Sequence, residues 1–146
     1  MLRSLLTGLP VMVLCLVAEA VFVTFCLRHQ AQVTSKWLAR PTRIRTTILL
    51  STVMLLMTIG NFVQTAIWAG LFVMLGEFSD FSHALYFSGV TFATLGYGDI
   101  LMSERWRLLG PMEAANGILM FGVSTAVMTA AVIDLAKRDK RKLGDR

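Results

Sequence analysis

Six consecutive residues in the second half of the chain have the chemistry of a cation-binding loop, Thr94-Leu95-Gly96-Tyr97-Gly98-Asp99. Backbone carbonyl oxygens and a threonine hydroxyl can replace the water around a cation without adding a full counter-charge. To point successive carbonyls at one axis, the backbone must alternate between right- and left-handed dihedral angles, and left-handed positions favour residues without a Cβ. Gly96 and Gly98 meet that need. Leu95 and Tyr97 are then expected to point their side chains away from the axis.

The composition indicates an integral membrane protein. Of the 146 residues, 55% are hydrophobic and 16% are charged, whereas soluble domains carry about 25% charge. Residues 46–76 contain no charged side chain, a run of 31 residues, and segments 4–27 and 108–133 contain one each, Glu19 and Glu113. Crossing the hydrocarbon core takes about 20 mostly apolar residues. Each of the three segments is long enough to span it.

The positions of the charges predict the topology. Segment 28–45 holds five of the 14 basic residues and no acid, residues 137–146 hold six, and segment 77–107 holds four acids and two bases. By the positive-inside tendency, the 28–45 linker and the C-terminal tail face the cytoplasm, and 77–107 faces out. We therefore expect the basic residues to contact anionic lipid rather than nucleic acid, in a multi-pass protein of the cell (inner) membrane.

The first apolar segment resembles a signal peptide, because Arg3 precedes an apolar run and Ala18-Glu19-Ala20 mimics a cleavage site. The apolar run continues through residues 21–27, which favours a retained helix. If that helix spans the membrane, its N-terminus lies outside, an orientation that Arg3 mildly opposes; a tilted or interfacial helix is the alternative.

A short helix is expected just before the cation-binding loop. Residues 82–93 form an apolar stretch of twelve after Ser79 or Asp80, either of which can cap a helix. Twelve helical residues extend about 18 Å, too short to cross a bilayer core of about 30 Å. The helix must therefore enter the membrane and stop. Non-helical backbone at that depth is tolerated where it is buried in protein or lines a watery cavity, which predicts a pore.

The segments 84–88, 90–91 and 94–100, with two flanking apolar spans, resemble the pore module of potassium channels. The resemblance implies an all-α membrane protein with an outer helix, a re-entrant pore helix, a selectivity filter and an inner helix, preceded by an extra N-terminal hydrophobic helix. The predicted divisions are 1–27 for that helix, 28–43 for the basic linker, 44–136 for the pore domain and 137–146 for the tail. The resemblance also implies a passive, potassium-selective channel rather than an enzyme, with no organic cofactor and no metal beyond potassium.

One loop supplies a single filter strand, and the chain carries no second copy. Three identical subunits are therefore the expected partners, in a homotetramer around a central pore. The ion-binding residues implied by the resemblance are Thr94, Leu95, Gly96, Tyr97 and Gly98. Residues expected to support them are Asp99, Tyr86, Phe87 and Val90, with Tyr97 braced against Tyr86 or Phe87.

The chain departs from the family pattern near the filter. Leu95 stands where Val is commoner, Ala93 where a second Thr is common, and His83 where the family often has Asp. Val90 stands where some bacterial members carry a carboxylate that partners the filter Asp. Asp99 therefore needs another partner, and the Tyr86 hydroxyl is the candidate.

The last apolar segment carries candidate gating and cavity residues. Gly117 occupies the place of the family's hinge glycine, although a packing role is an equal alternative. The predicted cavity lining is Ile118, Phe121 and Thr125. The alternative lining is Leu119, Gly122 and Ala126.

Two carboxyl groups lie within the predicted spans. We expect Glu113 behind the filter and pore helix, where its protonation alters conduction; the alternative is a structural hydrogen bond near the outer interface. Glu19 costs about 3 kcal/mol if it is central in the membrane, so a neighbouring helix should supply a partner, with Asn61 and Gln64 the candidates.

The sequence shows no ladder of arginines, and about ten residues follow the last span, so neither a voltage sensor nor a ligand-gating domain is expected. Two other functions remain open. Leu95 would favour a non-selective cation channel if it loosens the filter. A non-conducting membrane adaptor would retain the pore as a relic, which the intact 94–99 motif argues against.

Overall fold

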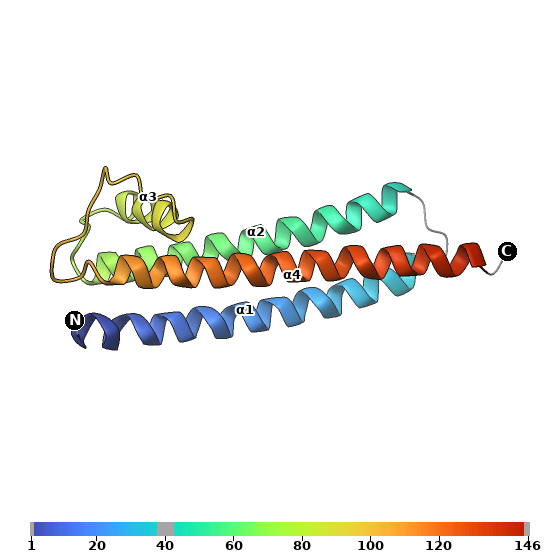
Figure 1. Cartoon of the computed structure of the whole chain (residues 1–146), viewed down its shortest axis with the longest axis horizontal. Helices are drawn as coiled ribbons and strands as arrows, with labels where there is room; N and C mark the ends of the chain where they lie inside the picture. Colours follow the sequence, from blue (N-terminus) through green and yellow to red (C-terminus); the bar gives the residue numbers. More distant parts are fainter. Residues whose placement is uncertain (1, 38–42, 145–146) are drawn as a thin grey trace.

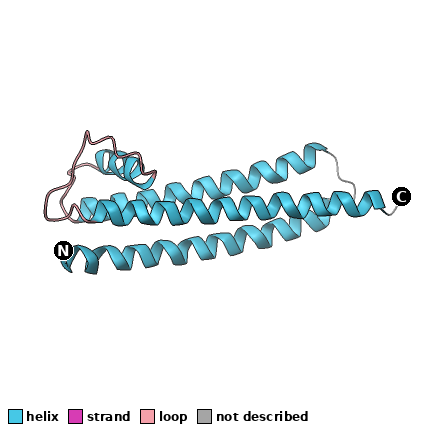
Figure 2. Ribbon diagram, in the orientation of Figure 1, coloured by secondary structure: helices cyan, strands magenta, loops and turns pink. Residues whose placement is uncertain are grey.

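The computed structural model describes residues 2–37 and 43–144, with side-chain positions for 2–28 and 44–137. It contains four helices in chain order and no strand within those ranges (Figures 1 and 2): α1 (Leu2–Trp37), α2 (Arg43–Met74), α3 (Phe81–Phe92) and α4 (Leu109–Gly144). The fold is all-α, as predicted. The expected pore helix is present as α3, with twelve residues and bounds within one residue of the prediction.

Three of the helices are long and apolar enough to cross a membrane, over Leu2–Arg28, Ile44–Met74 and Leu109–Lys137. They lie side by side, with α2 antiparallel to α1 and α4 (Figure 1). Helix α3 and its loops lie at the end where α1 begins, and the end of α1 and the start of α2 lie at the opposite end. The arrangement therefore places α3 and the loop of residues 94–99, called the pore loop below, at the opposite end of the bundle from the end of α1 and the start of α2.

Two helices run beyond the apolar spans. Helix α1 continues to Trp37, ten residues into the predicted 28–43 linker, and α4 continues to Gly144 through most of the predicted tail. The α1 extension includes Arg28, Ala31, Lys36 and two glutamines, and the α4 extension includes two arginines and two lysines, all residue types of high helix propensity.

Helix α1 packs lengthwise against α2 and α4 rather than standing apart from them. The amide Nε2 of Gln64 on α2 donates a 2.8 Å hydrogen bond to Oε2 of Glu19, and both side chains are buried. This confirms one of the two predicted partners of Glu19. The other was wrong, because Nδ2 of Asn61 donates to Oγ of Ser124 on α4, at 3.2 Å.

Among the described side chains, two clusters of buried apolar residues lie along the bundle. The larger, near α3, contains Cys15, Trp68, Ala69, Phe72, Ala84, Phe92, Trp106, Leu109 and Met120. The smaller, toward the opposite end, contains Cys26, Val53, Met57, Val127 and Ala131. The two cysteines are free and lie in different clusters, so no disulfide joins them.

Candidate functional site: the pore loop

Helix α3 begins with a side-chain cap. Asp80 has extended backbone angles (φ −128°, ψ 136°), and its carboxylate accepts a hydrogen bond from the backbone N–H of His83. The His83 ring lies 3.3 Å from the same carboxylate oxygen. Asp80 is therefore the N-cap, and His83 is a capping residue at the exposed start of the helix.

The chain after α3 turns back and hydrogen-bonds to the end of that helix. The amide of Thr94 donates to the carbonyl of Thr91 at 2.9 Å, and the amide of Leu95 donates to the carbonyl of Val90 at 2.9 Å. The amide of Gly96 also points at the Val90 carbonyl, 3.5 Å away. Val90 thus supports the loop through its backbone oxygen. With its amides directed at α3, the loop has its carbonyls available for another ligand.

The loop backbone alternates in handedness. Gly96 has a φ of +55° and Gly98 a φ of +76°, as predicted from the absence of a Cβ. Thr94 also has a positive φ, +59°, which the sequence did not predict. A left-handed conformation costs a residue with a Cβ about 1–2 kcal/mol. Left-handed positions therefore recur at every second residue from Thr94 to Gly98, the pattern that carbonyls directed at one axis require.

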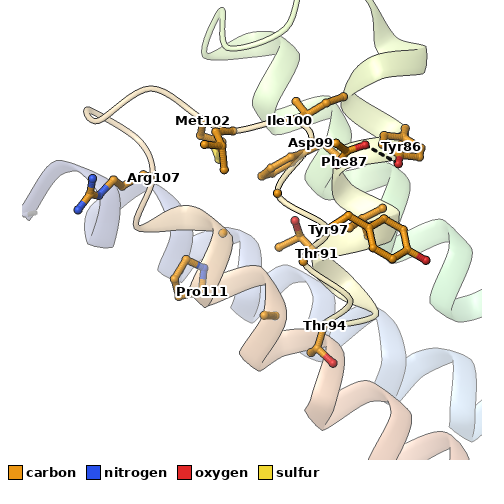
Figure 3. Close-up of a pocket in the computed structure, with 16 residues that line it drawn as sticks. Tyr86, Phe87, Thr91, Thr94, Tyr97, Asp99, Ile100, Met102, Arg107 and Pro111 are labelled. Atoms are coloured by element: carbon orange, nitrogen blue, oxygen red, sulfur yellow. Dashed lines mark hydrogen bonds between the residues drawn. The ribbon is translucent and has the colours of Figure 1, made fainter.

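The loop side chains of a single chain lie open. Leu95 is 56% exposed and Tyr97 is 65% exposed. Between the loop and the start of α4 is a hollow of about 470 Å³, lined by the loop and by α3 and α4 residues (Figure 3). Phe87, predicted as a brace for Tyr97, lies at this hollow but packs its ring against Phe72 and Phe78, at centroid distances of 5.5 and 5.3 Å.

Asp99 has the partner expected for it. The Tyr86 hydroxyl donates to Oδ2 of Asp99 at 2.7 Å, which joins the C-terminal end of the loop to α3 (Figure 3). This hydrogen bond lowers the pKa of Asp99 below its ordinary value of 3.8, and the same bond raises the pKa of Tyr86 above 10.0. Asp99 is therefore a carboxylate, and Tyr86 a phenol, across the neutral pH range.

A second carboxylate fixes the chain beyond the loop. Both oxygens of Glu77 accept hydrogen bonds from Ser103, one from its amide at 2.8 Å and one from its hydroxyl at 2.6 Å. The contact joins the α2–α3 connection to the segment between the pore loop and α4. Sequence reasoning missed it, because 26 positions separate the two residues and neither belongs to a recognisable motif.

Comparison with protein families decides the identity of this arrangement. A family model described as "Ion channel" matches residues 44–134, well over half of the chain. The chain belongs to this ion channel family. No curated protein and no solved structure matches the chain in the same comparisons.

The ion channel match covers α2, the pore loop and most of α4, and it leaves α1 outside. The chain is thus a multi-pass membrane protein built from a two-span channel module with a further apolar helix beside it. The contacts of Glu19 with Gln64 show that this helix belongs to the same packed unit.

Gly117 of the channel's α4 lies against the end of α3. A Cβ at this position would be 2.0 Å from the carbonyl oxygen of Phe92 and 2.9 Å from its carbonyl carbon. Backbone cannot give way as a flexible side chain can. The close packing of α3 on α4 therefore requires glycine here, which accounts for Gly117 as a packing residue. A hinge role remains a prediction.

The two predicted cavity stripes are both exposed on a single chain. The first comprises Ile118, Phe121 and Thr125, and the second comprises Leu119, Gly122 and Ala126. Phe121 in the first stripe packs edge-on against Phe92 of α3, at 5.6 Å between ring centroids. That contact places the first stripe beside the C-terminal end of α3.

Glu113 is buried in the channel module behind α3, as predicted. It is fully inaccessible and hydrogen-bonds through Oε1 to the Ser88 hydroxyl of α3. Its effect on conduction stays a prediction.

Proposed function

We propose that this ion channel conducts potassium passively, through a pore on the axis of four identical subunits. The observation that carries the proposal is the alternating handedness at Thr94, Gly96 and Gly98. An alternating backbone directs successive carbonyl oxygens to one side. Carbonyl oxygens are the ligands that replace the hydration shell in potassium-selective filters.

The hydrogen bonds of the loop support the same role. Because the amides of Thr94 and Leu95 are used by the carbonyls of α3, the loop is held from behind. Its oxygens, including the Thr94 hydroxyl, can then face an ion that has lost its water. The proposed mechanism requires potassium ions bound to these loop oxygens and no other cofactor.

The proposed assembly of four chains follows from the single pore loop that each chain supplies. A single loop offers oxygens from one side only, and a cation in a filter is surrounded. Four copies related by a closed rotation supply the missing sides. The apolar side chains of Leu95 and Tyr97, exposed on one chain, then lie where neighbouring subunits cover them.

The charges near the loop favour cations. Asp99 stays ionised to unusually low pH because Tyr86 stabilises its carboxylate. Four such groups around one axis form a negative ring at the outer mouth, of the kind that raises the local concentration of cations. On the opposite side, the basic residues of 28–45 and 137–146 suit contact with the anionic inner leaflet of the cell membrane.

Flux measured with purified protein in liposomes tests the proposal. The channel is expected to pass potassium and rubidium down a gradient, with a reversal potential that follows potassium alone in mixed sodium and potassium solutions. Gly96→Ala is the matched control, because its φ of +55° strains any side chain although no atom stands within 4 Å of the added Cβ.

Three outcomes oppose the proposal, each in a different way. A reversal potential that responds equally to sodium indicates a non-selective cation channel, with Leu95 the residue to exchange for Val. Absence of any flux from protein that assembles correctly favours the non-conducting adaptor. A native mass other than that of four chains contradicts the pore on a fourfold axis.

A further inference from the structure

Ser88 on α3 occupies a fully buried position where three helices meet. Its hydroxyl oxygen lies 2.8 Å from the backbone carbonyl of Thr65 on α2. The same oxygen hydrogen-bonds with Oε1 of Glu113 on α4, whose side chain is also fully buried. Through this one hydroxyl, the pore helix is joined to both of the helices that flank it.

The two contacts of Ser88 cannot both use the serine proton. A hydroxyl has one hydrogen to donate and two lone pairs with which to accept, whereas a backbone carbonyl only accepts. Ser88 must therefore donate to Thr65 and accept from Glu113. A carboxyl group donates only when it carries its proton, so this arrangement requires Glu113 to be neutral.

The surroundings of Glu113 fit a neutral carboxyl. Within the described side chains, no Lys, Arg or His forms an ion pair with it. Its second oxygen, Oε2, lies buried without a hydrogen-bond partner. Cys15 of α1 is a titratable group close enough to interact electrostatically with Glu113, and it carries no positive charge that could compensate a carboxylate. An ionised carboxylate in such a place would bear a large uncompensated desolvation penalty.

The contact between Ser88 and Glu113 lies one helical turn from a second contact between the same two helices, that of Phe92 with Gly117. Phe92 is four residues after Ser88 on α3, and Gly117 is four residues after Glu113 on α4, so the two pairs are one helical turn apart on both helices. The second pair is the backbone contact at Gly117. The filter begins at Thr94, two residues beyond Phe92. The hydrogen bond between Ser88 and Glu113 therefore helps to fix the position of Thr94 along the axis of α4.

We propose that Glu113 is a positioning residue for the pore loop, whose neutral carboxyl donates its proton to Ser88 and so holds the pore helix between α2 and α4. This rests on the proposed function for its conduction readout only.

The conservative variant Glu113→Gln distinguishes two requirements at this position, a hydrogen-bond donor and a negative charge. Its amide can donate to Ser88 as the protonated carboxyl does, so potassium flux and the potassium-to-sodium permeability ratio of the full-length channel in liposomes should stay within about twofold of wild type. Glu113→Ala and Ser88→Ala leave buried polar groups unpaired, and each should lower flux or selectivity by about tenfold. Glu19→Gln, the same exchange between α1 and α2, is the matched control and should resemble wild type.

Infrared spectroscopy tests the protonation state of Glu113 without any measurement of ion conduction. The difference spectrum of wild type minus Glu113→Gln should contain the carbonyl stretch of a protonated carboxylic acid. It should lack the pair of carboxylate stretches. This comparison decides the protonation state even for protein that passes no ion, so failure of the proposed function and failure of this inference are distinguishable.

Two results would overturn the inference. One is a Glu113→Gln channel as impaired as Glu113→Ala, since the charge rather than the donated proton would then be needed. The other is a difference spectrum that shows the loss of carboxylate bands.

Discussion

The carbonyl oxygen of Phe92 lies so close to Gly117 that a Cβ on the glycine would be 2.0 Å away from it. One turn earlier on both helices, Ser88 meets Glu113. These two contacts fix the pore helix on α4 by backbone packing at one level and by a hydrogen bond at the other. Together they define the position of the loop that follows Phe92.

Gly117→Ala should therefore displace α3 from α4. Overpacking of this kind costs about 1–3 kcal/mol, and here the obstructing atoms are backbone. We expect the midpoint of thermal unfolding in detergent to fall and potassium flux to be lost.

Gly70→Ala is the control for that variant, since nothing lies within 4 Å of a Cβ at Gly70 in helix α2. It should be neutral or stabilising, because Ala exceeds Gly in helix propensity by about 1 kcal/mol. Equal thermal midpoints for the two variants would contradict the close contact at Gly117.

Tyr86→Phe should make the outer mouth more sensitive to acid. The Tyr86 hydroxyl lowers the pKa of Asp99, so the stabilisation from this bond is present above the ordinary pKa and is lost as the pH falls through the lowered one. Without the hydroxyl, the pKa of Asp99 returns toward 3.8 and the carboxylate is protonated at a higher pH.

The measurement is potassium flux as a function of pH on the side of the pore loop. The acid decline of Tyr86→Phe should begin at a higher pH than that of wild type, and Asp99→Asn should lack this titration. Superimposable profiles for Tyr86→Phe and wild type would show that the hydrogen bond does not tune Asp99.

Glu77→Ala should loosen the segment between the pore loop and α4. The variant removes two exposed hydrogen bonds to Ser103, each worth about 0.5–1.5 kcal/mol. Trypsin cleavage after Arg105 and Arg107 in the same segment should be about 2- to 10-fold faster, and Ser103→Ala should act in the same direction. Glu104→Gln in the same segment serves as the control. If Glu77→Ala is cleaved as slowly as this control, the hydrogen bonds between Glu77 and Ser103 do not hold the segment in place.

The hydrogen bond from Gln64 to Glu19 should couple α1 to the channel module. In a double-mutant cycle of Glu19→Leu and Gln64→Leu, the two substitutions should be non-additive by about 0.6–2 kcal/mol in the free energy of unfolding. The double variant should be more stable than the sum of the single effects predicts, because no buried polar group is left alone. Strict additivity would mean that the contact contributes nothing.

Local chemistry made part of the pore loop predictable from the sequence. The length of α3, its Asp80 cap and the left-handed Gly96 and Gly98 follow from rules that act within a few residues. The bond from Tyr86 to Asp99 was predictable because Val90 stands where some bacterial members of the family carry the carboxylate that partners the filter Asp, so Asp99 needed another partner.

Contacts between distant segments were harder to predict. Asn61 and Gln64 share a face of α2, but the sequence does not give the rotation of α1 and α4 around it, so Asn61 was assigned to the wrong helix. The positive φ of Thr94 was missed because a β-branched residue argues against it. The sequence did not distinguish a packing role of Gly117 from a hinge role, and the packing role became evident from the distance to Phe92.

The buried pair of Glu19 and Gln64 has a consequence for how the chain enters the bilayer. A lone glutamate in the middle of a helix opposes insertion by about 3 kcal/mol, and α1 is made before the helix that supplies its partner. Helix α1 should therefore remain with the insertion machinery until α2 emerges, so that the two enter the lipid as a hairpin. Synthesis stalled before Gln64 should leave α1 open to extraction from the membrane by alkali.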